Sequence, residues 1–135
     1  MVKRGRLYKG AVVTLHAVAG WAYCGVLIGV GRRLLPMQAT LIIHAIGAPV
    51  GFALISRFYH RRFGYTSPWQ TAIAFLGIVV GLDVFLVAPV LEKSYAMFTS
   101  ALGTWIPFAF IFTATYFTGR WFEASRNTAH PPDRT

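Results

Sequence analysis

Asp83 is an acidic residue in the middle of an otherwise apolar stretch. Residues 72–88 read Ala-Ile-Ala-Phe-Leu-Gly-Ile-Val-Val-Gly-Leu-Asp-Val-Phe-Leu-Val-Ala, and the other acids, Glu92, Glu123 and Asp133, lie outside the apolar stretches. Inside a membrane, a carboxyl group costs on the order of a few kcal/mol unless it is paired, protonated or hydrated. Acidic residues in such segments commonly mark paths for protons, ions or substrates, so Asp83 is the first candidate for a functional group.

His44 is the expected partner of Asp83. It belongs to a narrow stripe of residues that recur at helical spacing and therefore face protein: Thr40, His44, Gly47, Ala48 and Gly51. In a medium of low dielectric constant, an imidazole and a carboxyl group stabilise each other's ionised forms and together hold or pass a proton. Asp83 and His44 are thus the predicted catalytic or proton-handling pair. The alternative is a structural clasp that fixes the register of the helices.

Polar residues from four apolar runs fall in one layer. Measured from the midpoint of each run at about 1.5 Å per residue, Tyr23, His44, Asp83 and Thr104 lie about 4 to 6 Å to the same side of the centre. The side chains predicted to bind a substrate around this layer are Tyr23, Ser100, Thr104, Trp105 and Phe108. Pro107 removes a backbone hydrogen bond and predicts a discontinuous fourth helix.

The elements that position these residues are predicted to be membrane helices. The 135-residue chain is 56% hydrophobic and 13% charged, with a mean hydropathy of +0.54, which is too apolar for a soluble domain. Apolar runs cover residues 10–31, 38–56, 68–91 and 97–119, each close to the roughly 20 residues that cross a membrane as a helix. We expect an all-α, polytopic membrane protein with four antiparallel transmembrane helices in one domain, residues 1–123, followed by a flexible cytoplasmic tail, residues 124–135.

The distribution of charge predicts the orientation. Thirteen Lys and Arg against four acids give a formal net charge of +9. With the N-terminus in the cytoplasm, only Arg32, Arg33 and Lys93 lie on the outer side, so the positive-inside rule places both termini inside. The expected location is a bacterial cytoplasmic membrane. No nucleic-acid partner is expected, because the basic residues lie at the ends of the spans and form no recognisable binding motif.

Basic and aromatic residues interleave between the second and third runs, in residues 57–67. This pattern is typical of an anchor at the membrane surface. The sharper alternative is specific binding of an anionic lipid headgroup by Arg57, Arg61 and Arg62. Ser67 and Pro68 then form a helix start, with a capping hydroxyl followed by proline in the first turn.

Glycines four residues apart occur in three of the runs, as Gly25 and Gly29, Gly47 and Gly51, and Gly77 and Gly81. Such pairs let helices approach closely in a membrane. They predict a tightly packed bundle that also forms a homo-oligomer.

No metal or cofactor is expected. The sequence contains no HExxH, GxSxG, phosphate-binding loop or Cys/His cluster, and His44 with Asp83 alone supplies too few metal ligands. His16 and His44 are separated by about 12 Å in depth, which disfavours a haem held between them. Whether either histidine binds a cofactor on its own stays open.

Three functions remain compatible with these residues. The leading hypothesis is a transporter or channel-like protein in which Asp83 and His44 handle a proton and a small solute. The second is a cofactor-independent membrane enzyme, an isomerase, hydratase or cyclase, with Asp83 as general acid or base for a lipophilic substrate. The third is a non-catalytic subunit of a larger complex. The residues do not identify the substrate.

Overall fold

Long helices dominate the structure. The computed structural model describes residues 2–129, with side chains for residues 5–125. In this part of the chain the elements are all helical, and the long ones are α1 (Val2–Leu34), α2 (Met37–Arg62), α3 (Pro68–Leu82) and α4 (Ile106–Ala129). Shorter segments connect α3 to α4, namely η1 (Asp83–Leu91), η2 (Ala96–Thr99) and η3 (Ala101–Trp105). The π-helix η1 continues α3, and the π-helix η3 leads into α4.

Four helical segments among the described residues are long and apolar enough to cross a membrane. They are Gly5–Leu34, Met37–Arg62, Pro68–Leu91 and Ala101–Ser125. The third has the bounds expected from the sequence, whereas the second continues past residue 56. Helix α4 extends to Ala129, past residue 123, where the helical part was expected to end. The rest of the expected tail, residues 130–135, lies outside the described residues.

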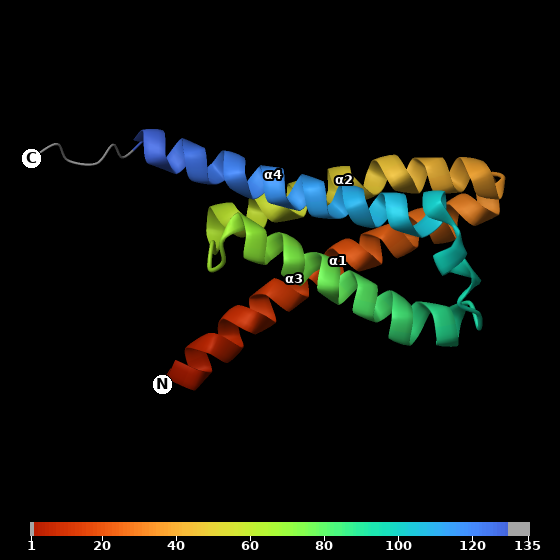
Figure 1. Cartoon of the computed structure of the whole chain (residues 1–135), viewed down its shortest axis with the longest axis horizontal. Helices are drawn as coiled ribbons and strands as arrows, with labels where there is room; N and C mark the ends of the chain where they lie inside the picture. Colours follow the sequence, from red (N-terminus) through yellow and green to blue (C-terminus); the bar gives the residue numbers. More distant parts are fainter. Residues whose placement is uncertain (1, 130–135) are drawn as a thin grey trace, which may run out of the picture.

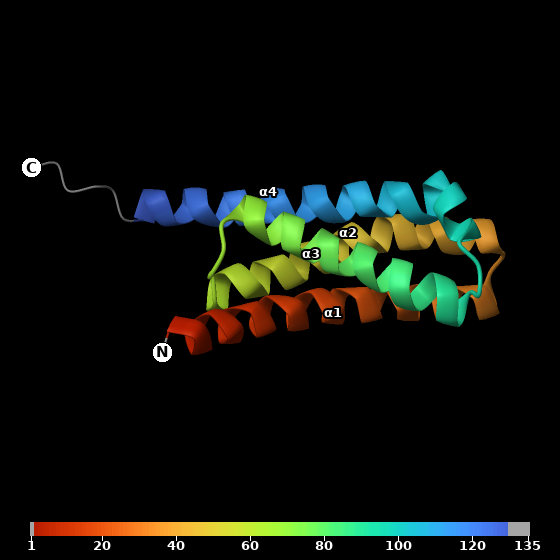
Figure 2. The same cartoon turned by 60° about the horizontal axis from the view of Figure 1, so that its bottom comes forward.

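The helices pack as a bundle whose connections alternate between its two ends. Figure 2 shows the N-terminus, the α2–α3 connection and the end of α4 at one end, which we call the terminal end. The α1–α2 connection and η2 lie at the other, the distal end. In Figure 1, α1 and α3 cross near the middle of the bundle and diverge on either side. Towards the distal end, this divergence separates α1 from η1.

The half of the bundle nearer the terminal end has a packed aromatic core. Phe52 and Tyr59 of α2 and Phe75 of α3 are fully buried. The ring of Phe75 lies edge-on to both, with centroid distances of 6.2 Å to Phe52 and 5.9 Å to Tyr59. Gly20 of α1 permits this packing, because a methyl group built there would lie 2.5 to 2.9 Å from the ring of Phe52. Large buried rings contribute strongly to packing energy, so this core closes the terminal half of the bundle.

Helix α3 begins as the sequence predicts. The Ser67 hydroxyl accepts a hydrogen bond from the backbone of Gln70 at 3.3 Å, and the Gln70 side chain accepts one from the backbone of Ser67 at 3.1 Å. This reciprocal capping box satisfies backbone donors that a helix start leaves open. Pro68 follows in the first turn.

The glycine pairs have different environments. Gly47 and Gly51 of α2 lie under side chains of α1, where Leu27 and Tyr23 occupy the space that larger residues would need. By contrast, Gly25 and Gly29 of α1, and Gly77 and Gly81 of α3, have open space beside them. Only the α2 pair therefore serves packing within the described chain.

Replacing Gly20 with alanine should destabilise the bundle, because the added methyl group meets the buried ring of Phe52, which has no room to move. Overpacking of this kind costs about 1–3 kcal/mol. Gly10→Ala, on the same helix, is the matched control, since its methyl group would meet no atom within 4 Å. Unfolding of both variants in detergent micelles measures the difference. Equal stability of the two variants would contradict the described contact between α1 and α2.

Candidate functional site

Asp83 lies at the junction between α3 and η1, and its carboxyl group is bound by tryptophan. The indole nitrogen of Trp21 on α1 donates a hydrogen bond of 3.0 Å to Oδ1 of Asp83. Because the indole N–H is only a donor, it matches a carboxyl oxygen, which is an acceptor. This bond joins the two helices that cross in the middle of the bundle (Figure 1).

Asp83 and His44 line the same small cavity, which we call the inner chamber, but they are not hydrogen bonded to each other. The chamber has a volume of about 80 Å³. His44 is only 6% exposed, as its stripe predicts, and its Nδ1 atom has no hydrogen-bond partner among the described residues. The Asp83 carboxyl group is thus hydrogen bonded to Trp21 and not, as expected, to the His44 imidazole, although His44 lines the same chamber. A cavity of this size holds several water molecules.

The remaining wall of the inner chamber is mostly apolar. Besides Trp21, His44 and Asp83, it is formed by Cys24, Gly25, Ile28, Val79, Val87, Met97, Gly103, Pro107, Phe108 and Ile111. Phe108 is therefore the one ring from the predicted substrate site that reaches this chamber. A few polar groups in an apolar wall are the usual composition of a site for a small molecule.

A larger cavity, the outer vestibule, lies next to the inner chamber on the distal side. Its volume is about 470 Å³. The two cavities share wall residues, namely Gly25, Ile28, Val87, Met97 and Gly103. The two cavities are therefore adjacent, and we refer to them together as the hollow, with Asp83 and His44 in the wall of its inner part. Ser100 and Thr104, both predicted to bind a substrate, line the vestibule.

An ion pair stands at the rim of the outer vestibule. Arg32, near the end of α1, donates two hydrogen bonds to Glu92, at 2.7 and 3.2 Å. These side chains are 42% and 34% exposed, so the rim is accessible at the distal end of the bundle. An exposed ion pair contributes only about 0–1 kcal/mol, which makes it an easily broken link between α1 and the segment after η1.

Proline and hydroxyl groups account for the irregular helices around the hollow. Pro89 lies within η1 and has no backbone N–H to donate to Val84, five residues earlier in this π-helix. The Tyr95 hydroxyl donates to the Val84 carbonyl instead, at 3.3 Å. On the other side, the Ser100 hydroxyl caps η3 by accepting from the Gly103 backbone at 2.9 Å. Residues 101–105, just before Pro107, form the π-helix η3, which passes directly into α4, so the discontinuity expected in the fourth helix is seen only as a change of helix type.

Tyr23 and Trp105 lie outside the hollow. The Tyr23 ring covers Gly51 on α2 and is 38% exposed. Trp105 is 56% exposed, and its indole donates to the Phe98 carbonyl at 2.7 Å. Both residues share the expected depth, but they point to other faces of their helices. Depth along a helix is set by residue number, whereas direction also depends on how the helix is rotated in the bundle.

Trp21 is the site residue that the sequence analysis missed. It lies near the middle of the first apolar run, although tryptophan is most common at the ends of membrane helices. That unusual position was an available signal, because a buried indole N–H needs an acceptor. In this chain the acidic residue of the third run supplies it.

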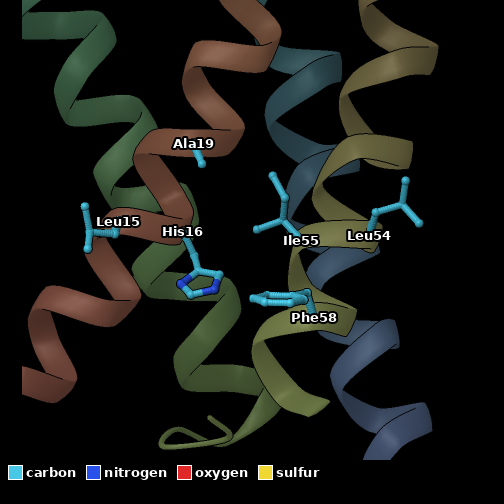
Figure 3. A pocket seen from close by; sticks show the side chains of 6 residues that line it. All are labelled: Leu15, His16, Ala19, Leu54, Ile55 and Phe58. Carbon is cyan, nitrogen blue, oxygen red and sulfur yellow. The ribbon is translucent and has the colours of Figure 1, made fainter. Parts of the chain in front are cut away.

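His16 lines a separate hollow of about 380 Å³ between α1 and α2 (Figure 3). Its Nδ1 atom lies 2.7 Å from the Val12 carbonyl, and its ring points towards Phe58, with centroids 5.8 Å apart. This hollow shares no wall residue with the inner chamber. His16 and His44 therefore do not face a common cavity. Among the described residues, no three His, Cys, Asp or Glu side chains are placed to hold a metal ion.

Comparison with known proteins finds no match to a family model, a curated protein or a solved structure.

Replacing Trp21 with phenylalanine should destabilise the fold, because a partly buried carboxyl oxygen loses its donor while the ring is retained. The expected cost is about 1–3 kcal/mol. In an Asp83→Leu background the same change should cost much less, since the acceptor is already gone. Trp69→Phe is the control, because the Trp69 indole donates to no described residue and is 56% exposed. Unfolding of the original protein, Trp21→Phe, Asp83→Leu and the double variant in micelles gives the coupling energy between the two side chains. A coupling energy near zero would exclude the bond.

Proposed function

We propose that the chain is an integral membrane protein with four antiparallel transmembrane helices. The third candidate span supports this most directly, because it has the highest hydropathy, 2.5, yet only 17% of its apolar window is buried within the described chain. Large side chains such as Phe85 and Leu15 are 79% and 67% exposed. Apolar surface of this extent is typical of contact with lipid. The distribution of Arg and Lys favours a bacterial cytoplasmic membrane with both termini and the terminal end inside.

The function we propose is transport of a small amphipathic solute coupled to a proton on Asp83. The supporting observation is the pair of adjacent cavities, of which the outer one has an accessible rim and the inner one is lined by a carboxyl group in the middle of the bundle. The vestibule has the size of a site for a small organic molecule. In the proposed membrane orientation, the hollow faces outward, and the core of Phe52, Tyr59 and Phe75 closes the inner side.

Each polar group has a role in this proposal. Asp83 carries the proton, Trp21 holds one carboxyl oxygen in place, and His44 exchanges a proton with Asp83 through water in the inner chamber. Thr104 donates its hydroxyl hydrogen to the Met97 carbonyl at 2.6 Å, so its oxygen remains available as an acceptor towards the vestibule. Arg32 and Glu92 separate to admit the solute.

One observation favours a second function, that of a membrane enzyme acting on a lipophilic substrate. The hollow has a closed inner side, and a closed cavity suits a substrate that enters and leaves by one route. Asp83 would then be the general acid or base, with His44 within the same chamber as the second proton-handling group.

The uncovered glycine faces support a further proposal, that copies of the chain associate. Gly77 and Gly81 have open space beside them, on a helix whose apolar surface is largely unburied. Small residues of this kind allow helices to meet closely in lipid. A homo-oligomer would bury this face. The same face would serve as a partner surface if the chain were a subunit of a larger complex.

Asp83→Asn should abolish proton movement driven by a solute gradient, because the amide keeps the size and the Trp21 contact but cannot carry a proton. The measurement uses reconstituted vesicles with an internal pH-sensitive dye and a panel of small amphipathic solutes. Glu123→Gln is the control, since Glu123 is exposed and lines neither part of the hollow. Solute-driven flux that persists in Asp83→Asn would refute the transport proposal. Asp83-dependent chemical conversion of a panel compound without flux would support the enzyme.

Gly25→Phe should block solute binding without disturbing the fold. Gly25 lines both the inner chamber and the vestibule, and a side chain added there meets no atom within 4 Å at its first carbon. The phenyl ring would fill the hollow, so we expect binding to weaken by about tenfold or more, equivalent to at least 1.4 kcal/mol. Gly10→Phe adds the same ring outside the hollow, at a position with equally open space. Equal solute binding by both variants would show that the hollow is not the binding site.

A further inference from the structure

A furrow of about 800 Å³ lies between α2 and α4 towards the terminal end of the bundle. Two exposed arginines from different helices, Arg57 and Arg120, line it together. The rest of its wall is formed by Ala53, Leu54, Phe117, Thr118, Trp121 and Ala124. The furrow is separate from the hollow at Asp83, with which it shares no wall residue.

The two helices arrange charged and apolar groups in the same order. On α2, Leu54 lies one turn closer to the middle of the bundle than Arg57, and on α4, Phe117 lies one turn closer than Arg120. One turn corresponds to a rise of about 5 Å. The furrow therefore has a basic end near the terminal end of the bundle and an apolar floor towards its middle.

The arginines of the furrow have no acidic partner among the described residues. The acidic residue nearest to Arg120 in the sequence is Glu123, which lines a different cavity together with Gly64 and Pro68. Guanidinium groups bind phosphate with paired, charge-assisted hydrogen bonds. The basic end of the furrow therefore fits a phosphate group, and the two arginines could bind it from both sides.

The apolar floor indicates what carries the phosphate. Leu54 and Phe117 are each 62% exposed, so the floor offers uncovered hydrocarbon surface directly beside the basic end, and Trp121, which follows Arg120, is 60% exposed. A nucleic acid or an acidic peptide would satisfy the arginines but leave this surface uncovered. An anionic phospholipid matches both parts, with its phosphate at the arginines, its acyl chain along the floor and the Trp121 ring at headgroup level.

We propose that the furrow between α2 and α4 binds one anionic phospholipid, with Arg57 and Arg120 holding the phosphate. The proposal rests on the proposed membrane placement. It also changes the identity of the headgroup residues expected from the sequence. Arg57 is retained, whereas the exposed Arg61 and Arg62 do not line the furrow and Arg120 takes their place.

The test compares two double variants with equal loss of charge at the same end of the bundle, Arg57→Gln with Arg120→Gln and Arg61→Gln with Arg62→Gln. Dioleoylphosphatidylglycerol is titrated into the purified protein in uncharged detergent, and bound lipid is counted by native mass spectrometry. Losing two charge-assisted phosphate contacts should weaken binding by about tenfold or more in the first variant. The second variant should bind within about twofold of the original protein, because its arginines lie outside the furrow.

Three probes separate a lipid site from a site for a free anion. Dioleoylphosphatidylcholine should bind about tenfold more weakly than the phosphatidylglycerol, and dihexanoylphosphatidylglycerol and inorganic phosphate should compete poorly because they leave the floor uncovered. Equal losses in the two double variants, no preference for the anionic lipid, or full competition by inorganic phosphate would each overturn the proposal.

The same variants distinguish this proposal from the proposed transport function. Arg57→Gln with Arg120→Gln should retain the Asp83-dependent proton flux, since the furrow and the hollow are separate. If the protein binds the anionic lipid selectively but shows no Asp83-dependent flux, the lipid-site proposal is supported and only the transport proposal is refuted. Both arginine side chains are exposed, and neither makes an ion pair with a described residue, so the variants should fold. Circular dichroism in the same detergent checks this.

Discussion

The hydrogen bond from the Trp21 indole to the Asp83 carboxyl joins α1 to the junction between α3 and η1. On the terminal side of this point the bundle is filled by fully buried rings such as Phe52 and Phe75, whereas on the distal side it contains the inner chamber and the outer vestibule. The bond therefore stands at the boundary between a packed half and a hollow half. It fixes the carboxyl group in the chamber wall, and it uses only one of the two carboxyl oxygens in a described hydrogen bond. Without it, the Trp21 N–H and one Asp83 carboxyl oxygen would lose their described partner, which is costly in an apolar environment.

The irregular helices explain how the distal half stays open. A regular α-helix through residues 83–107 would place consecutive carbonyls and amides in one continuous ladder, but Pro89 and Pro107 each remove a donor from it. The chain responds with π-helical turns on both sides of the connection, and local hydroxyl groups complete the hydrogen bonding, as Tyr95 does for Val84. Wider turns of this kind often occur at functional sites. Here they also form the wall of the hollow, since Val87 of η1 and Gly103 of η3 line both of its parts.

The sequence was most informative where the physical signal is periodic or local. Apolar length predicted the helices, Ser67 and Pro68 predicted the start of α3, and the spacing around His44 predicted that this side chain is buried. The hydrogen-bond partner of Asp83 was harder to predict. His44 and Trp21 both lie at a suitable depth, and only the rotation and crossing of α1 decide which of them reaches the carboxyl group. The same limit explains Tyr23 and Trp105, which share the layer but face other directions. The furrow at Arg57 and Arg120 could not be predicted from the sequence, because it is formed by the packing of α2 against α4. The two arginines are far apart in the chain, and no local pattern relates them.

The unequal packing of the two halves also determines which motions are easy. At the distal end, α1 is linked to the segment after η1 by an exposed ion pair, whereas at the terminal end the rings of Phe52, Tyr59 and Phe75 are fully buried. Movement at the rim therefore costs little, but access from the terminal side requires these rings to separate. An enzyme needs only the first motion, while a transporter needs both. Asp83 offers a way to couple the second motion to a proton, because protonation replaces a charge-assisted bond from Trp21 with an ordinary one of about half the strength. The bond that weakens links α1 to the end of α3, so in the transport proposal protonation loosens the link between these two helices.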